Sequence, residues 1–401
     1  MLDLIVIRCP GGAEEGVMST RRTFLLQAVA TAAASSAVSA RSPRARVRLA
    51  IAGLVHDHAR GFLPTVLGNP EVQLCGIVEP NRTLFDRYAK EFHLLPSLRF
   101  DALDRLLSSN KIDAVATFTS TLGHRAVVDV AAAHRVHVMV EKPLATTLAD
   151  AQSMAAVARK AGIELIVNYE TSFYPSTRTC IPYVTKQHGI GDVRKIVLRA
   201  GHEGPAYICS AEFLAWLTDP IENGGGALMD FGCYGADLAT CLLPGSRPIA
   251  VSAVTQSFQP KVYPKVEDEA NLLIAYPEAV VVVEASWNWP RDQKELDVYG
   301  TDAELHQPDR DTLILRQGDV IRGSDGKVSF REKTEGRSLP TTRPAEEPST
   351  PLAYLVAVAR GDLKPSGAAT LDTNLLVMEI LEAAKESARS KRQVLLKASP
   401  A

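Results

Sequence analysis

A buried β-strand is predicted over Arg46-Val47-Arg48-Leu49-Ala50-Ile51-Ala52-Gly53, an apolar run that stops at a glycine. Further short apolar runs occupy 72–79, 112–118, 136–140 and 164–167, and helical stretches at 85–92, 124–133 and 148–161 separate them. Short buried strands that alternate with helices are typical of a parallel sheet with helices on both faces. The sequence therefore predicts a doubly wound α/β domain over residues 46–168.

The pattern changes from about Arg194. Strand-like segments with little helix between them occupy 195–200, 249–257, 270–276, 279–287 and 296–300. This pattern predicts an α+β domain with a large, mainly antiparallel sheet over residues 169–397. A helix is expected over 373–388, and the polar, proline-rich segment 333–350 is expected to be a surface loop.

Composition excludes several classes of protein. The chain has 401 residues, enough for two domains, and a formal net charge of −2. A chain without a basic domain has no general attraction to nucleic acid, so no nucleic-acid partner is expected. The six cysteines include no CxxC pair. His56, Asp57 and His58 are adjacent on a turn and are not expected to converge, so no metal is expected.

Residues 1–45 are predicted to be an N-terminal extension with a twin-arginine signal. Arg21-Arg22 precede an alanine-rich run that ends at Val38-Ser39-Ala40, a small-residue cleavage site. The run is too short and too polar to predict a membrane span. We expect export in the folded state to the periplasm, with a tightly bound cofactor loaded beforehand. Either Met1 or Met18 can be the true start.

The turn after the first strand is a candidate dinucleotide site, because a helix N-terminus after a glycine turn can bind pyrophosphate. The turn is Gly53-Leu54-Val55-His56-Asp57-His58, in which Val55 and His58 replace the second and third glycines of G-x-G-x-x-G. A plain structural turn is the alternative. Our hypothesis is that His56 or His58 hydrogen-bonds the pyrophosphate in place of glycine N–H groups. Glu79 ends the second predicted strand. A carboxylate at this position can accept hydrogen bonds from ribose hydroxyls and repels a 2′-phosphate, which favours NAD over NADP. Arg82 lies nearby and keeps NADP as the alternative cofactor.

Two further motifs carry candidate catalytic residues. Glu141-Lys142-Pro143 follows a buried strand, and Gly224-Gly225-Gly226 precedes a helix with Asp230 and Tyr234. The i, i+4 spacing places Asp230 and Tyr234 on one helix face, with Asp237 on the same side. Gly232 and Gly235 lower helix stability, which indicates that another element packs closely against this helix.

These residues carry a resemblance to a known family. The chain has Thr119-Ser120-Thr121-Leu122-Gly123-His124, then His137-Val138-Met139-Val140-Glu141-Lys142-Pro143, then Gly224-Gly225-Gly226-Ala227-Leu228-Met229-Asp230-Phe231-Gly232-Cys233-Tyr234. From about residue 46 to 397 it resembles the glucose–fructose oxidoreductase / inositol dehydrogenase (Gfo/Idh/MocA) family. The resemblance implies a Rossmann domain joined to a sheet domain, NAD or NADP as cofactor, and a sugar, polyol or related substrate.

The resemblance also assigns roles to residues. The family's lysine falls on Lys142, its aspartate on Asp230 and its catalytic histidine on Tyr234, and Thr119, His124, Glu141 and Lys142 join the candidate cofactor residues. Ser120 replaces a proline of the family pattern. Thr171-Ser172 stand where the family commonly has an arginine before Phe-x-Pro.

Hydride transfer from an alcohol requires removal of the hydroxyl proton. Tyr234 can accept this proton only if its pKa falls toward neutrality, and we expect the Lys142 ammonium to lower it. Asp230 is expected to orient a substrate hydroxyl, and His202, Trp216 and Asp237 to line the substrate pocket. The alternatives are an ion pair of Lys142 with Glu141 and a merely packed Tyr234.

The predicted function is NAD(P)-dependent interconversion of hydroxyl and carbonyl groups on a sugar, polyol or related compound. A cofactor-dependent glycoside-cleaving enzyme that oxidises its substrate transiently is one alternative. A cofactor-free carbohydrate-binding protein on the same scaffold is the other. The run 279–283 is apolar at consecutive positions, so both faces of that strand are expected to be buried. One face can pack under helices of the same chain and the other against a second subunit, which predicts a homo-oligomer.

Overall fold

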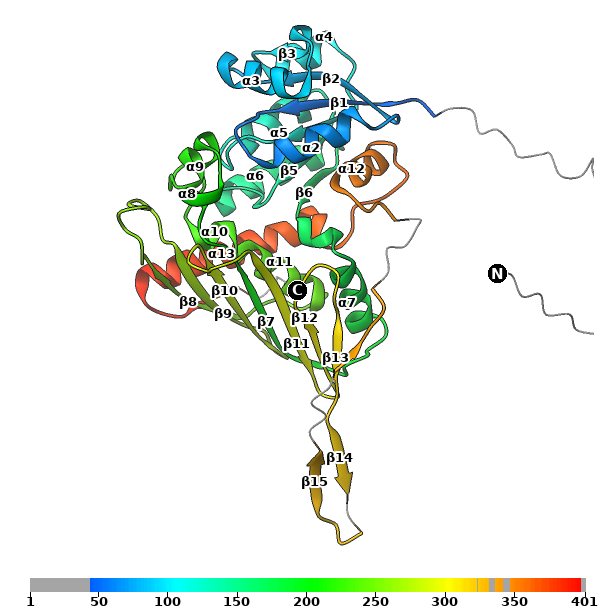
Figure 1. Cartoon of the computed structure of the whole chain (residues 1–401), viewed down its shortest axis with the longest axis vertical. Coiled ribbons are helices and arrows are strands. Elements are labelled where there is room, and N and C mark those ends of the chain that lie inside the picture. The colour runs from blue at the N-terminus through cyan, green and yellow to red at the C-terminus, as the bar shows by residue number, and fades with distance from the viewer. Residues whose placement is uncertain (1–43, 323, 332–335, 342–346, 398–401) are drawn as a thin grey trace, which may run out of the picture. The chain divides into compact units, whose positions relative to one another are not determined.

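Six strands form a parallel sheet in the order β3-β2-β1-β4-β5-β6 (Figure 1). This computed structural model describes residues 44–322, 324–331, 336–341 and 347–397. The strands are β1 Val47–Ala52, β2 Val72–Val78, β3 Arg99–Phe100, β4 Ala114–Thr117, β5 His137–Glu141 and β6 Leu165–Asn168. The order is that of a Rossmann sheet, which confirms the predicted fold and places its switch point between β1 and β4.

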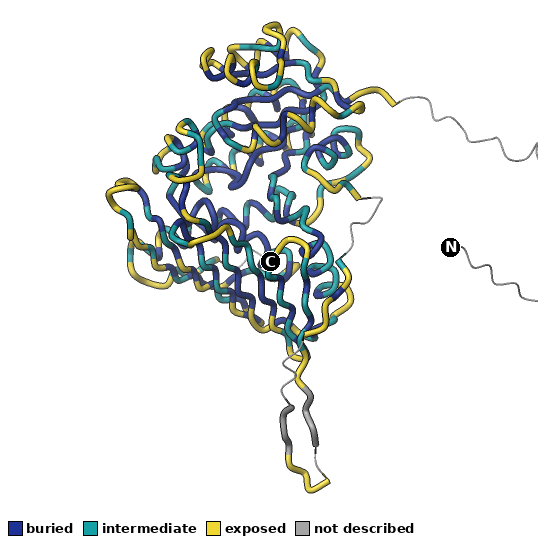
Figure 2. Tube along the Cα trace, in the orientation of Figure 1, coloured by how far each residue is buried: buried dark blue, intermediate teal, exposed yellow. Residues whose placement is uncertain are grey.

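The helices of this domain cover both faces of the sheet. They are α2 His58–Leu67, α3 Arg82–Phe92, α4 Leu103–Ser109, α5 His124–Ala133 and α6 Leu148–Ala161. Alternate residues of β1 belong to different apolar clusters, since Ala50 and Ala52 pack on one side and Leu49 and Ile51 on the other. Burial on both faces explains why the strands are continuous apolar runs rather than alternating ones (Figure 2).

A nine-stranded sheet follows, in the order β16-β13-β12-β11-β7-β10-β9-β8-β17. All neighbouring pairs are antiparallel except β7 with β10. This confirms the predicted mainly antiparallel sheet. Its strands are β7 Val193–Gly201, β8 Ala250–Gln256, β9 Glu269–Ala275, β10 Val280–Ser286, β11 Gln293–Gly300, β12 Glu304–Gln307, β13 Ile314–Arg316, β16 Arg337–Ser338 and β17 Val394–Leu395. A separate hairpin joins β14 Asp319–Arg322 to β15 Val328–Arg331.

Two helices, α11 Gly232–Leu242 and α13 Leu371–Ser390, pack on one face of this sheet (Figure 1). A side chain at Gly235 would overlap Val283 of β10, as the predicted close packing requires. A Cβ at Gly232 would lie 3.6 Å from Leu381 Cδ2, an ordinary contact, so Gly232 is not required there. On the opposite face, Leu273 and Val280 are exposed.

The C-terminal part of the chain returns to the Rossmann domain. Helix α12 Pro351–Ala359, which the pattern did not predict, packs on α2, and its Leu352, Leu355 and Val356 join the same apolar cluster as β1. One segment of the predicted second domain is thus part of the first domain's core. The predicted loop 333–350 contains the two-residue strand β16, which pairs with β13 at the sheet edge.

The predicted signal segment lies almost entirely outside the described residues, and its role stays a prediction. Among the described helices, none combines the length and the apolar character that crossing a bilayer requires.

Candidate active site

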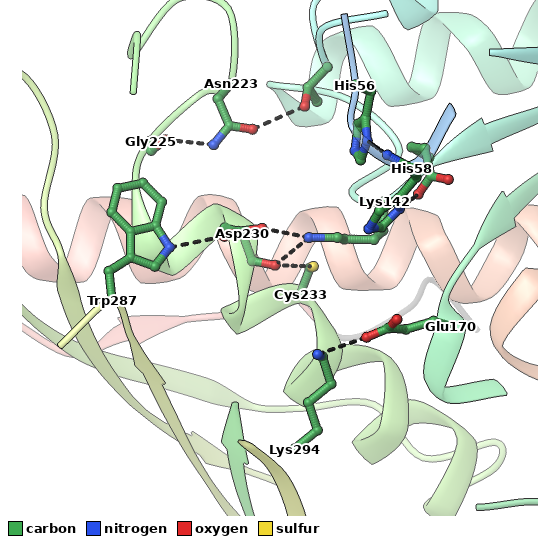
Figure 3. Close-up of polar contacts among 12 residues, drawn as sticks. His56, His58, Lys142, Glu170, Asn223, Gly225, Asp230, Cys233, Trp287 and Lys294 are labelled. Atoms are coloured by element: carbon green, nitrogen blue, oxygen red, sulfur yellow. Dashed lines mark hydrogen bonds and ion pairs between the residues drawn. The ribbon is translucent and has the colours of Figure 1, made fainter. Parts of the chain in front are cut away.

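A buried ion pair joins the two domains. Lys142 directly follows β5, and Asp230 is the last residue of α10 Ala227–Asp230. The Lys142 Nζ lies 2.5 Å from Asp230 Oδ1 and 3.0 Å from the Asp230 carbonyl oxygen (Figure 3). The indole N–H of Trp287 donates to Asp230 Oδ2 at 2.9 Å. The structure thus pairs Lys142 with Asp230, whereas the alternative was pairing with Glu141.

Both members of this pair are charged. Burial opposes ionisation of Asp230, but the charge of Lys142 outweighs it, so the pKa of Asp230 is lowered. Burial likewise opposes the charge on Lys142, and Asp230 outweighs it, so the pKa of Lys142 is raised. Each side chain is 7% exposed or less. The arrangement holds an ammonium group at a fixed place at the carboxyl edge of the Rossmann sheet.

Tyr234 lies beside this ammonium group. The Lys142 Nζ is 5.0 Å from the centre of the Tyr234 ring and 5.8 Å from that of Phe231. Burial, followed by the charge of Glu170, raises the pKa of Tyr234 well above its usual value of 10. The expectation that Lys142 lowers this pKa is wrong, because burial dominates and the Lys142 charge is balanced by Asp230. Tyr234 is therefore a neutral hydroxyl donor.

A second ion pair, which the sequence did not predict, lies beside the rings of Phe231 and Tyr234. Lys294 of β11 lies 2.7 Å from Glu170, the first residue of the 3-10 helix Glu170–Phe173. The Lys294 Nζ is 5.6 Å from the centre of the Tyr234 ring. Neither residue belongs to a motif, and they are far apart in the sequence, so no pattern could have joined them.

His202, a predicted pocket residue, directly follows β7 and lies beside Phe231 of this site. Its ring packs edge-on against Phe231, with ring centres 4.9 Å apart. Its Nδ1 accepts the Gly204 N–H at 2.9 Å, so the proton of the neutral ring is on Nε2. Burial lowers the pKa of His202, which favours this neutral form.

The turn between β1 and α2 is the candidate cofactor site. Gly53 has φ +85°, and a Cβ there would lie 2.7 Å from Thr119 Cγ2, so this glycine is required where β1 meets β4. Val55 is half-buried beside it. Glu79, 3% exposed, accepts the Leu54 N–H and the Asn81 N–H, both at 2.9 Å. The predicted residues of the turn and of β2 therefore do lie together.

Helix α9 Ala211–Leu217 is attached to this turn. Asp57 accepts hydrogen bonds from the backbone N–H of Ser210 at 2.8 Å and from its hydroxyl at 2.5 Å. Trp216 donates its indole N–H to the Val55 carbonyl oxygen at 3.2 Å and packs against His56. The ring and the N–H of Trp216 are thus engaged with the turn, a placement that does not favour its predicted role in lining the substrate pocket.

Thr119 lies in the loop between β4 and α5, and His124 is the first residue of α5. Thr119 donates to the Ser120 carbonyl oxygen at 2.9 Å, and Ser120 donates to Glu222 at 2.6 Å. His124 is buried, its Nδ1 lies 3.1 Å from the Leu144 carbonyl oxygen, and burial lowers its pKa to about 4. Its Nε2 has no hydrogen-bond partner among the described residues.

His56 and His58 do converge, contrary to the expectation for adjacent turn residues. Their ring centres are 4.4 Å apart, and His58 Nδ1 lies 3.1 Å from Oε2 of Glu141. The strand end of β5 supplies the third group, which reasoning from the turn alone could not include. The structure therefore brings together three of the residues that were predicted to bind the cofactor.

Asp237 is placed differently from the other site residues. It is fully buried on α11, and neither carboxylate oxygen has a hydrogen-bond partner among the described residues. Burial raises its pKa well above 3.8, so the carboxyl is protonated. Because Asp237 is fully buried, this placement does not favour direct contact between its carboxyl group and a substrate.

Comparison with known families agrees with this geometry. Residues 47–169 match an oxidoreductase family with an NAD-binding Rossmann fold, and residues 184–306 match the GFO/IDH/MocA C-terminal domain. Together the two matches cover more than half of the chain. The chain therefore belongs to the Gfo/Idh/MocA family of oxidoreductases.

One curated relative is dTDP-3,4-didehydro-2,6-dideoxy-alpha-D-glucose 3-reductase of Streptomyces antibioticus. It is 26% identical over 192 residues, which are 48% of this chain and 55% of the relative. The chain spans about half the length of several of the curated relatives that it matches.

Solved structures share the fold. An aldose-aldose oxidoreductase from Caulobacter crescentus, complexed with glycerol, has a TM-score of 0.70 at 24% identity and covers 88% of this chain and 100% of its own. An inositol dehydrogenase homolog from Azotobacter vinelandii, complexed with NAD+, has a TM-score of 0.72 at 19% identity, with 88% and 98% covered. At these identities the likeness concerns the fold alone.

Proposed function

We propose that this protein is a nicotinamide-dependent oxidoreductase that interconverts a hydroxyl and a carbonyl group on a sugar, polyol or related compound. The observation that carries the proposal is the buried Lys142–Asp230 pair, which lies beside Tyr234 at the carboxyl edge of the Rossmann sheet. Ligands of such sheets bind at this edge. The curated relative named above, a reductase of a nucleotide-linked sugar, supports the substrate class.

The residues of the turn fit a dinucleotide. Glu79 keeps a free lone pair on each carboxylate oxygen after accepting two backbone N–H groups, so it can still accept ribose hydroxyls. The buried His124 Nε2 is left without a partner among the described residues. Thr119 borders Gly53 at the switch point. A carboxylate at the position of Glu79 repels a 2′-phosphate, so we propose NAD as the cofactor.

The protein's own groups would stabilise charge on the reacting oxygen. When bound, the nicotinamide supplies or accepts the hydride. The Lys142 ammonium, held by Asp230, is a preorganised donor for an oxygen on which negative charge develops. Tyr234 is a second donor, since its raised pKa keeps the hydroxyl protonated, and in carbonyl reduction it would supply the proton that the oxygen takes up with the hydride. Neutral His202 can donate through Nε2 to another substrate oxygen.

We further propose export with the cofactor already bound. The signal pattern at Arg21-Arg22 motivates the route. Slow cofactor release is supported by α9, which Asp57 and Trp216 attach to the cofactor turn. A turn that is held by a second element opens less readily than a free one.

The test is turnover of a panel of sugars and polyols by the purified chain with NAD+ or NADP+. We expect substrate-dependent reduction of NAD+, which is measured by the near-ultraviolet absorbance of the reduced nicotinamide. Binding of sugars without any hydride transfer, in protein shown to hold the cofactor, would overturn the proposal and favour a carbohydrate-binding protein.

A further inference from the structure

Three side chains that commonly bind metals meet beside the β1–α2 turn. His56 lies in the turn, His58 is the first residue of α2, and Glu141 is the last residue of β5. One ligand atom from each lies within 4.8 Å of the others. Two imidazoles and one carboxylate form a known protein ligand set for Zn2+.

Outer contacts orient these groups. The Asn168 amide donates to Oε1 of Glu141 at 2.9 Å, while the buried Oε2 lies 3.1 Å from His58 Nδ1. The His56 ring packs against Phe213, with ring centres 4.6 Å apart. Such outer partners fix the direction of metal ligands.

The nearby charge of Lys142 does not prevent cation binding, because its ammonium is already paired with Asp230 at 2.5 Å. His56 and Glu141 are 2% and 1% exposed, so little water competes for their ligand atoms. Binding would displace two contacts, the 3.2 Å hydrogen bond from the His58 N–H to His56 Nδ1 and the 3.1 Å contact between His58 Nδ1 and Glu141 Oε2.

We propose that His56, His58 and Glu141 form a binding site for a divalent transition-metal ion, with Zn2+ as the preferred ion. Three protein ligands leave one tetrahedral position open for water or a ligand oxygen. His58 stands where the usual dinucleotide turn has its third glycine. The site does not depend on the proposed hydride transfer.

Metal binding is measured directly on the full chain. Chelator-treated protein is dialysed against Zn2+ and analysed for metal, and a second sample is titrated with Co2+ and followed by visible absorption. We expect one Zn2+ per chain and the d–d bands of Co2+ bound by nitrogen and oxygen ligands. Failure to bind either ion stoichiometrically would overturn the proposal.

Variants locate the ion. Glu141→Gln keeps the size of the side chain and the Asn168 contact, and His58→Ala removes an exposed ligand, so both should fold. We expect each to weaken Zn2+ affinity at least roughly tenfold. His134→Ala is the control, because His134 forms a surface contact with Asp104 at 2.8 Å, and it should bind as the parent does. Unchanged affinity in Glu141→Gln and His58→Ala would show an adventitious ion and overturn the site.

Discussion

The Lys142 ammonium contacts both the carboxylate and the carbonyl oxygen of Asp230, at 2.5 and 3.0 Å. Because Trp287 holds the other carboxylate oxygen, the position of the ammonium is set by residues of both domains. A donor fixed in this way needs no reorganisation when charge develops on a substrate oxygen.

Lys142→Ala should lower the turnover rate by roughly 10²–10⁴-fold, the usual effect of removing a positioned catalytic group. It also leaves Asp230 buried and unpaired, which should lower the free energy of unfolding by about 3–5 kcal/mol. Steady-state kinetics and denaturant unfolding measure the two effects. The control Lys142→Met with Asp230→Asn removes both charges and should recover stability but not activity. Wild-type activity in either variant would contradict the role of Lys142.

Tyr234→Phe should lower the rate by about 10²-fold, as expected when one donor to a developing oxyanion is lost. The raised pKa of Tyr234 keeps the hydroxyl protonated beyond pH 10, so ionisation of this group should not appear in the pH–rate profile below that value. The pH–rate profiles of the parent protein and of Tyr234→Phe are compared to test this. A limb near neutral pH that disappears in the variant would show a phenolate base instead.

Asp237→Asn should stabilise the protein at neutral pH. The pKa of Asp237 is raised in the folded state, so the folded chain binds more protons than the unfolded one between 3.8 and the folded-state pKa. The stability that this group contributes is therefore complete below 3.8 and decreases as the pH rises toward the folded-state pKa. Denaturant unfolding at about pH 5 and about pH 8 should show an advantage for the variant that grows with pH. An advantage independent of pH would contradict a buried neutral carboxyl.

The exposed face of the nine-stranded sheet should form an interface between subunits. Leu273 and Val280 are 48% and 39% exposed on it, and Val282 pairs directly with Leu273. Leu273→Glu should therefore dissociate the oligomer, which light scattering at micromolar concentration detects. Leu67→Glu, at an equally exposed leucine at the end of α2, is the control and should leave the assembly intact. A monomeric parent protein would refute the interface.

Apolar runs and motifs were sufficient to predict both sheets and to select Lys142 and Asp230 as candidate site residues, but not to predict that these two residues pair. Strands such as β1 and β4 are buried on both faces, so their sequences are distinct from those of surface segments. Lys142 and Asp230 could be found because each belongs to a motif. Helix α12 was missed, although Thr350 caps it and Pro351 begins it, because it lies at the end of a proline-rich stretch.

Properties that depend on tertiary contacts could not be predicted. The Glu170–Lys294 pair joins segments without local signals, and only the fold brings them to Tyr234. The convergence of His58 with Glu141 requires the end of β5 to lie beside the β1 turn. The pKa of Tyr234 was predicted in the wrong direction because burial, which the sequence does not reveal, outweighs one neighbouring charge.

The nicotinamide content of the purified chain tests the central claim most directly. Protein is freed of loosely bound nucleotides by gel filtration and denatured, and the released cofactor is identified by mass and quantified against the chain. We predict about one NAD per chain, retained through purification because α9 holds the turn. A chain that carries no nicotinamide and binds none when NAD+ or NADP+ is supplied would contradict the assignment as an oxidoreductase.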